Sequence, residues 1–180
     1  MPPESQRRYL VIFDRDGVLN VDSGYAFDPD KLEWMPGAKA AVARVNRAGA
    51  VAVIATNQSG IGRGYYTEAQ MNAFHAEMLR QLAAEGSRID AVYFAPHHED
   101  AAEVHYRVAD HPDRKPNPGM LLQALSDFGI DPKDAIMIGD KSSDMEAARR
   151  AGVAGFLYRD GDLDAFVSER LAALMGTDVS

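Results

Sequence analysis

Two aspartates near the start of the chain are the first residues whose types and spacing suggest chemistry. Asp14 and Asp16 directly follow the apolar run Tyr9–Phe13, and such a run predicts a strand buried on both faces, as in parallel sheets. Gly17 comes next and frees the backbone to turn sharply. Ligands of open α/β sheets bind beyond the carboxyl ends of the strands, so both carboxylates are expected at a site.

Three further groups of polar residues lie at the ends of predicted elements and should face the same crevice. They are Thr56-Asn57, Asp140-Lys141 with Asp144 one turn further on, and Arg114-Lys115 just before a helix. Carboxylates without thiol partners favour a hard divalent cation, and we expect Mg²⁺. Lys115, Thr56 and backbone N–H groups suit the oxygens of a phosphoryl group. The metal and the lysine would cancel the repulsion that otherwise prevents a carboxylate from attacking phosphorus.

Strands that alternate with helices must position these groups. Apolar runs predict strands at 9–13, 51–55, 91–94, 135–138 and 155–158, with helical periodicity after each of them. This alternation predicts an α/β fold with right-handed crossovers, namely a Rossmann-like, three-layer, doubly wound parallel sheet. The length of 180 residues suits a single domain over 1–180, with residues 1–8 as a loose N-terminal segment.

Two helix starts carry capping signals. Thr67 and Gln70 have the spacing of a capping box at the start of a long helix. Ser142 or Ser143 is expected to cap the helix that ends at Gly152.

The overall composition restricts the partners and the compartment. The formal net charge of −8 argues against nucleic acid or an anionic membrane surface as a partner. No apolar run approaches the length of a membrane span or of a signal-peptide core. Cysteine is absent, which fits a reducing compartment. We therefore expect a cytoplasmic protein, acting as a monomer on a small phosphorylated molecule.

The four groups of motif residues together resemble the haloacid dehalogenase-like phosphatases. The matching residues are Asp14-Arg15-Asp16-Gly17, Thr56-Asn57, Lys115-Pro116 and Gly139-Asp140-Lys141-Ser142-Ser143-Asp144, in this order. Within that superfamily, the longer stretches at 14–20, 56–61, 96–98 and 114–120 resemble the branch of heptose-bisphosphate and histidinol-phosphate phosphatases. The resemblance extends from about Tyr9 to Tyr158.

The resemblance implies a role for each motif residue. Asp14 would be the nucleophile and a metal ligand, and Asp16 the general acid and then the general base, with its backbone carbonyl on Mg²⁺. Asp140 would be the second metal carboxylate, with Asp144 in an outer shell. Thr56 and Lys115 would hold the transferring phosphoryl group, and Lys141 would pair with Asp14 or with the phosphate.

The resemblance also implies a capless domain, in which loops select the substrate. The expected substrate-binding residues are Asp22, Ser23, Gly24, Tyr25, Asn57, Gln58, Ser59, Arg63, Arg114 and Lys141. Residues 95–118 form the predicted specificity loop. Because Arg114 stands next to Lys115, a substrate with a second anion is favoured. The expected reaction is removal of the 7-phosphate of D-glycero-D-manno-heptose 1,7-bisphosphate, with histidinol phosphate as the alternative substrate.

Two other interpretations of the acidic turn compete with this one. A calcium-binding loop is excluded, because Val18, Leu19 and Tyr25 occupy its fifth, sixth and twelfth positions. A catalytically idle, phosphate-binding or regulatory module would have lost the nucleophile or a metal carboxylate. Asp14, Asp16 and Asp140 are all present, which favours an enzyme.

Relatives in the resembled branch commonly hold zinc in the specificity loop with three cysteines and one histidine. The corresponding positions here are Ala95, His97, His111 and Asp113. Ala95 cannot coordinate a metal, and the remaining three would resemble an open, weak site. We therefore do not expect structural zinc, and His97, His111 and Asp113 are its only candidate ligands.

Overall fold

A sheet of five parallel strands forms the centre of the protein, in a computed structural model that describes residues 8–176. The strands are β1 (Leu10–Phe13), β2 (Val51–Asn57), β3 (Ala91–Ala95), β4 (Ala135–Gly139) and β5 (Ala154–Leu157). Their order is β3-β2-β1-β4-β5. The direction of winding therefore reverses between β1 and β4, where open α/β sheets bind their ligands.

Strand β1 is central because its apolar run can be buried on both faces. All four of its side chains are fully buried, and Phe13 pairs with Ile54 of β2 and with Ile138 of β4. Val11 and Phe13 face one hydrophobic cluster, and Leu10 and Ile12 face the other. The predicted α/β, doubly wound parallel sheet is confirmed.

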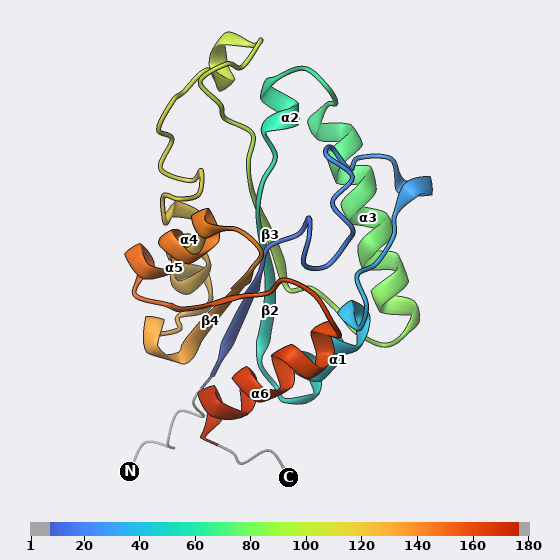
Figure 1. The fold of residues 1–180 in the computed structure, drawn as a ribbon, viewed down its shortest axis with the longest axis vertical. Coiled ribbons are helices and arrows are strands. Elements are labelled where there is room, and N and C mark those ends of the chain that lie inside the picture. The colour runs from blue at the N-terminus through green and yellow to red at the C-terminus, as the bar shows by residue number, and fades with distance from the viewer. Residues whose placement is uncertain (1–7, 177–180) are drawn as a thin grey trace.

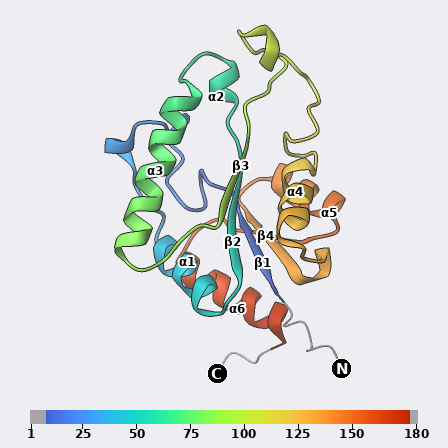
Figure 2. The same ribbon diagram turned by 180° about the vertical axis from the view of Figure 1, so that it is seen from behind.

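Helices cover both faces of the sheet, which makes three layers (Figures 1 and 2). The helices α1 (Ala38–Arg47), α3 (Glu68–Ala84) and α6 (Leu163–Met175) pack on one face. The helices α4 (Gly119–Phe128) and α5 (Ser142–Ala151) pack on the other. The two layers hold β1 and β4 rigidly, so residues that follow these strands start from fixed positions.

One of the two predicted helix caps is correct. At the start of α3, Thr67 Oγ1 accepts from Gln70 N at 3.1 Å and Gln70 Oε1 accepts from Thr67 N at 2.9 Å. The predicted serine cap of α5 is wrong, because the N-cap position is Lys141 and the helix already includes both serines. Asp144, in the first turn, accepts from Lys141 N instead, at 3.1 Å.

Long connections follow β1 and β3, and neither contains a domain of its own. Residues 14–37 include one 3₁₀ turn (Pro29–Lys31), and residues 96–118 include another (Val104–Tyr106). Strand β2 runs two residues beyond the predicted run and leads into the short, unpredicted helix α2 (Ser59–Gly62). The predicted specificity loop lies beside α2, where Ala102 N donates to Gly62 O at 2.8 Å (Figure 1).

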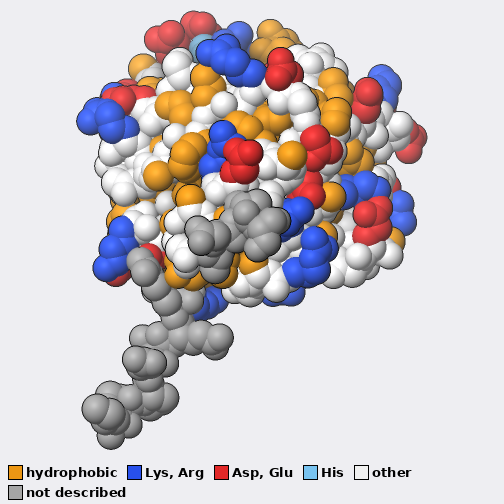
Figure 3. Space-filling model, turned by 60° about the horizontal axis from the view of Figure 1, so that its bottom comes forward, with side chains coloured by type: hydrophobic (Ala, Val, Ile, Leu, Met, Phe, Trp, Pro, Cys, Tyr) orange, Lys and Arg blue, Asp and Glu red, His pale blue; other side chains and the backbone are white. Residues whose placement is uncertain are grey.

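The surface carries charges of both signs. In the view of Figure 3, basic and acidic side chains are interspersed among apolar ones. In the described part of the chain, the helices are all too short or too polar to cross a membrane. The predicted loose N-terminal segment comprises residues 1–8, of which residues 1–7 lie outside the described part of the chain.

Candidate active site

Asp14 and Lys115 form a buried ion pair just beyond the end of β1. Lys115 Nζ lies 2.9 Å from Asp14 Oδ1 and 2.6 Å from Asp144 Oδ1, and it donates to Ala55 O at 2.8 Å. Asp14 is 6% exposed and Lys115 is 3% exposed. Burial alone would lower the pKa of Lys115, but the two carboxylates outweigh it and the pKa is raised. The lysine is therefore a fixed positive charge beside the predicted nucleophile.

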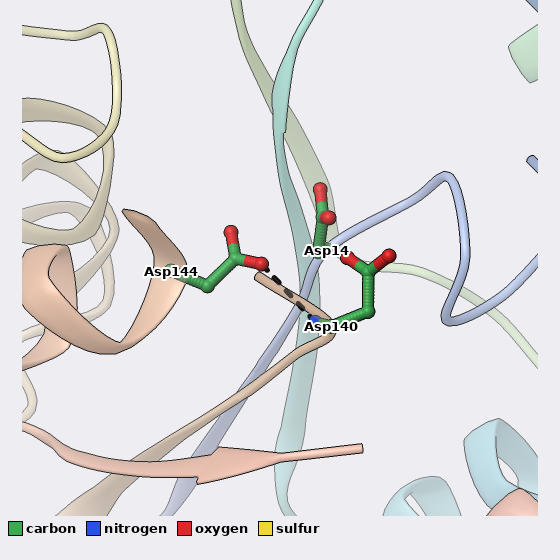
Figure 4. Close-up of side chains that lie close together, drawn as sticks. All are labelled: Asp14, Asp140 and Asp144. Atoms are coloured by element: carbon green, nitrogen blue, oxygen red, sulfur yellow. Dashed lines mark hydrogen bonds between the residues drawn. The ribbon is translucent and has the colours of Figure 1, made fainter. Parts of the chain in front are cut away.

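The turn between β4 and α5 brings in Asp140 and Asp144. Asp144 Oδ2 accepts from the backbone N–H groups of Asp140 and Lys141, each at 3.1 Å. Figure 4 shows the bond to Asp140. On the other side of the site, Gly17 has a φ of +84°, and a Cβ at this position would lie 2.2 Å from Asp140 Oδ2. Only glycine allows the Asp14–Gly17 turn to come this close to Asp140.

Asp14, Asp140 and Asp144 together fit a divalent cation. One oxygen of each lies within 4.8 Å of the others, and Figure 4 shows the three carboxylates converging. Asp140 Oδ1 is buried without a hydrogen-bond partner. Burial raises the pKa of Asp14 to about 7 against the opposing effect of Lys115, and burial also raises the pKa of Asp140. A hard cation would favour the ionised forms and satisfy the unpaired oxygen.

Asp16 is held from its buried side by Arg15. The Arg15 guanidinium is fully buried and its Nη2 lies 2.9 and 3.0 Å from the two Asp16 oxygens. Arg15 also donates to Ala26 O at 2.7 Å, and its Nη1 lies 3.0 Å from Nε2 of His75. Burial and the nearby guanidinium lower the pKa of His75 to about 4, so the neutral imidazole can accept from Arg15. Asn20 Nδ2 donates to Asp16 Oδ1 at 2.9 Å.

The end of β2 places three predicted site residues next to these acids. Gln58 Nε2 donates to Asp16 Oδ2 at 3.0 Å and to Thr56 Oγ1 at 2.8 Å. Asn57 forms a two-bond clamp with the backbone of Lys115, since Asn57 Nδ2 donates to its carbonyl and Asn57 Oδ1 accepts from its N–H, both at 3.0 Å. Asn57 therefore fixes the position of Lys115 in addition to any contact with substrate.

A cavity of about 480 Å³ opens above this group. Its walls include eight of the ten predicted substrate-binding residues. These are Asp22, Gly24, Tyr25, Asn57, Gln58, Ser59, Arg114 and Lys141. Ser23 and Arg63 do not line this cavity; Arg63 Nη2 instead lies 2.8 Å from His98 Nε2.

Two cations of the cavity wall differ in their partners. Lys141 was expected to pair with Asp14 or with the phosphate; its Nζ lies 3.6 Å from Asp22 Oδ2, because the loop after β1 brings Asp22 across to it, and contact with a phosphate stays a prediction. Arg114 is half buried, and its guanidinium donates to His97 O at 3.3 Å. Within residues 8–176, the Arg114 guanidinium forms no ion pair with a carboxylate. It is therefore available to an anion that enters the cavity.

The candidate zinc ligands lie in the specificity loop, away from the carboxylates. The rings of His97 and His111 stack with a centroid distance of 3.6 Å and an interplanar angle of 4°. His111 Nδ1 accepts from Asp113 N at 3.1 Å. Among the described residues, Asp14, Asp140 and Asp144 form the one group of three or more such side chains whose ligand atoms come together.

Four residues that hold the side chains of the site in place were not among the predicted site residues: Arg15, Asn20, Tyr66 and His75. Arg15 and Asn20 lie inside the acidic turn motif, so their position offered a signal. Tyr66 and His75 lie far along the chain and reach the site only through the packing of α2 and α3 on the sheet. The sequence carries no local signal for them.

The fold and the carboxylate–lysine cluster define a class of protein. A family model described as HAD-hydrolase-like matches residues 113–174. A protein of Rhodopseudomonas palustris is 41% identical over 100% of this chain and 99% of its own length. The chain belongs to the haloacid dehalogenase-like hydrolase family.

The individual relatives in this family carry closely related names. The Rhodopseudomonas palustris protein is a D-glycero-beta-D-manno-heptose-1,7-bisphosphate 7-phosphatase. A structure of a HAD-like phosphatase from Mesorhizobium loti has 35% identity and a TM-score of 0.86, covering 97% of this chain and 89% of that one. A D,D-heptose 1,7-bisphosphate phosphatase from B. bronchiseptica, complexed with magnesium and phosphate, has 34% identity and a TM-score of 0.81 over 92% and 99%.

Proposed function

We propose that this chain is a Mg²⁺-dependent phosphatase that removes the 7-phosphate of D-glycero-D-manno-heptose 1,7-bisphosphate. The observation that carries the proposal is the buried group of Asp14, Asp140, Asp144 and Lys115. Lys115 also lines a cavity whose wall carries Asp16 and Arg114. The names of the similar proteins support the same substrate.

In the first step Asp14 attacks phosphorus and becomes an aspartyl-phosphate. The bond from phosphorus to the sugar oxygen breaks, and Asp16 gives its proton to that oxygen. Lys115 offsets the negative charge that Asp14 and the phosphoryl group bring together, and Thr56 donates to a phosphoryl oxygen. Because Lys115 is fixed by Ala55 and Asp144, little reorganisation is needed when charge moves during the reaction.

In the second step a water molecule attacks the aspartyl-phosphate and Asp16 takes its proton. The bond from phosphorus to Asp14 breaks, so inorganic phosphate leaves and the nucleophile is regenerated. Asp14, Asp140 and the backbone carbonyl of Asp16 would hold Mg²⁺, with Asp144 in the outer shell. Bound there, the ion supplies positive charge that offsets the repulsion between the nucleophile and the phosphoryl group.

Arg114 gives a reason to prefer a bisphosphate. Its guanidinium lines the cavity and makes no ion pair with a carboxylate among the described residues. Burial and then the nearby Arg63 lower its pKa against the opposing effect of Glu99. A second phosphate on the sugar would supply the missing anion and bind in a bidentate manner. Histidinol phosphate carries a cationic group in place of that phosphate, so Arg114 disfavours it.

The proposal extends to the loops and to the state of the protein. Residues 95–118 act as the specificity loop of one HAD-like domain, and Asp22, Gly24, Tyr25 and Ser59 contact the sugar. We also propose that the protein acts as a monomer. A cytoplasmic location is proposed because a sugar with two phosphates does not cross a membrane unaided.

A substrate panel tests this function. The purified protein with Mg²⁺ is offered both anomers of the heptose 1,7-bisphosphate, heptose 7-phosphate and histidinol phosphate, and released phosphate is measured. We expect one phosphate per bisphosphate, heptose 1-phosphate as the product, and loss of turnover with a chelator. Histidinol phosphate as the best substrate would overturn the substrate assignment, and absence of any turnover would favour the idle module.

A further inference from the structure

The Gln58 side chain has all of its polar atoms hydrogen-bonded inside the candidate active site. Nε2 donates to Asp16 Oδ2 and Thr56 Oγ1, at 3.0 and 2.8 Å, and Oε1 accepts from the Tyr66 hydroxyl. The backbone of Gln58 is fixed too, because its N–H donates to Ala95 O at 2.8 Å. With 2% exposure and both amide hydrogens already used, this side chain has little capacity left for substrate.

Tyr66 sets the orientation of this amide. A hydroxyl that donates can pair only with Oε1, so the Nε2 group must point toward Asp16 and Thr56. Burial raises the pKa of Tyr66 to about 12, which keeps the hydroxyl protonated. The Tyr66 ring stacks on Phe27 with centroids 5.0 Å apart, and a Cβ on Gly60 would lie 2.2 Å from it. The ring is therefore held on two sides.

The orientation of Gln58 has a direct consequence for Thr56. Thr56 Oγ1 already accepts from Gln58, so its own hydrogen must point elsewhere. The only acceptor it has among the described residues is Asn57 O, at a long 3.4 Å. The hydroxyl can therefore turn to a phosphoryl oxygen at little cost.

The same amide also restricts Asp16. Arg15 and Asn20 hold the carboxylate from the acidic turn, and Gln58, which directly follows β2, donates to Oδ2. If the amide were flipped, Oε1 would face the carboxylate and repel it. The position of the carboxylate therefore depends on which way the amide points.

We propose that Gln58 and Tyr66 are positioning residues, in which Tyr66 orients Gln58 and Gln58 holds Asp16 where it protonates the departing sugar oxygen. This inference rests on the proposed function, since it assigns Asp16 the role of general acid. It replaces the expectation that Gln58 binds substrate. The Tyr66 ring also lines the cavity, but its hydroxyl donates to Gln58 Oε1, and we assign its effect on the reaction to that bond.

The test compares two leaving groups. A sugar oxygen needs a proton as it departs, whereas the p-nitrophenolate of p-nitrophenyl phosphate does not. The value of kcat/KM reports the steps up to the departure of the leaving group. Removing Gln58 or the Tyr66 hydroxyl should therefore lower kcat/KM more for the sugar phosphate than for the aryl phosphate. For Tyr66→Phe we expect kcat/KM to fall about tenfold for the sugar phosphate and less than about twofold for the aryl phosphate.

Gln58→Met keeps the shape of the side chain and removes all three hydrogen bonds. This variant should lose more kcat/KM on both substrates than Tyr66→Phe does, because Thr56 is released as well. The ratio of kcat/KM for the sugar phosphate to that for the aryl phosphate should again fall by about tenfold. In the Gln58→Met background, adding Tyr66→Phe should change neither rate by more than about twofold, since the residue through which Tyr66 acts is gone.

Tyr93→Phe is the matched control. It also removes a hydroxyl that makes a hydrogen bond, but to Asp127 Oδ2 at 2.7 Å rather than into the active site. Both rates should stay within about twofold of wild type.

The outcomes separate the two proposals. Equal losses on the two substrates, or additive effects in the double variant, would overturn the positioning role and leave the phosphatase intact. If the Tyr66→Phe variant does not fold, the Gln58→Met variant still tests the positioning role, through its ratio of kcat/KM for the sugar phosphate to kcat/KM for the aryl phosphate. Failure of the wild-type protein on every phosphate monoester would remove the proposed function, and this inference with it.

Discussion

The carboxylate cluster and the outer part of the predicted specificity loop (residues 97–111) are built differently. In the cluster, Asp14, Lys115 and Asp144 are almost completely buried and are joined by contacts of 2.6 to 2.9 Å. In the outer loop most side chains are exposed, and Val104 is 78% exposed. The outer loop is held by backbone hydrogen bonds and by stacked rings such as those of His97 and His111.

This difference separates chemistry from selectivity. Most of the groups that would transfer a phosphoryl group start from the ends of β1, β2 and β4, whose positions the core fixes. Lys115 comes from the connection before α4, but Asn57 of β2 holds its backbone. The groups that would select the substrate lie on connections that the core hardly constrains. Substitutions in the cluster should therefore have large, all-or-none effects, and substitutions in the loop should have graded ones.

The largest effect is expected for Asp14→Asn. The amide cannot attack phosphorus, so turnover should fall at least about 10⁴-fold on every phosphate monoester. Stability should not fall, since the change removes one of three crowded carboxylates in the metal-free protein. Steady-state assays measure the turnover, and thermal unfolding measures the stability. The control is Asp160→Asn, at an exposed position. Near wild-type hydrolysis would remove Asp14 from its assigned role.

Lys115→Met should have the next largest effect, and it should appear in stability as well as rate. The change leaves Asp14 and Asp144 facing each other without their shared cation, and breaking a buried pair in this way costs about 3–5 kcal/mol. Urea unfolding in the absence of Mg²⁺ measures this cost. The matched control is Lys133→Met, whose exposed pair with Asp131 should contribute almost nothing. Equal urea midpoints for Lys115→Met and Lys133→Met would contradict the view that the buried charge of Lys115 stabilises the fold.

Arg114→Ala should have an intermediate effect that depends on the substrate. We expect kcat/KM for the bisphosphate to fall by roughly 10- to 100-fold, about 1.4 to 2.7 kcal/mol, while a monophosphate is spared. The comparison of heptose 1,7-bisphosphate with heptose 7-phosphate measures it. Equal losses on both would show that Arg114 serves the reacting phosphate or the fold, and the distinction between cluster and loop would then not hold at this residue.

The sequence predicted the cluster well because its residues directly follow apolar runs. Once 10–13, 51–57 and 135–139 are recognised as neighbouring parallel strands, Asp14, Thr56 and Asp140 must come together. Strand β2 was predicted two residues too short because Thr56 and Asn57 are not part of its apolar run. They are in the strand because they pair with Phe94 and Ala95 of β3, a long-range contact.

Side-chain partners in the connections could not be predicted in the same way. Lys141 pairs with Asp22 and Arg63 lies against His98, in each case across two segments far apart in the sequence. The short helix α2 contains two glycines, so its local propensity is poor. Gly60 is needed there for another reason, namely the close approach of the Tyr66 ring.

The smallest effect, and the sharpest test of the outer loop, concerns zinc. Protein purified without added metal should contain less than about 0.1 zinc per chain, because the candidate ligands are poorly arranged. A zinc ion binds in the plane of an imidazole, along the nitrogen lone pair. The stacked rings of His97 and His111 direct their lone pairs along parallel planes, so they do not converge on one ion.

Elemental analysis and a chelator titration measure this prediction. Chelation should leave the thermal unfolding midpoint unchanged, and His97→Ala should lower the stability by no more than about 1 kcal/mol, the range of one partly exposed ring contact. The control is His105→Ala, a more exposed histidine of the same loop. The opposite outcome is stoichiometric zinc that is lost in His97→Ala or His111→Ala but kept in His105→Ala. It would mean that a bound metal holds the outer loop, and that the loop resembles the cluster in its construction.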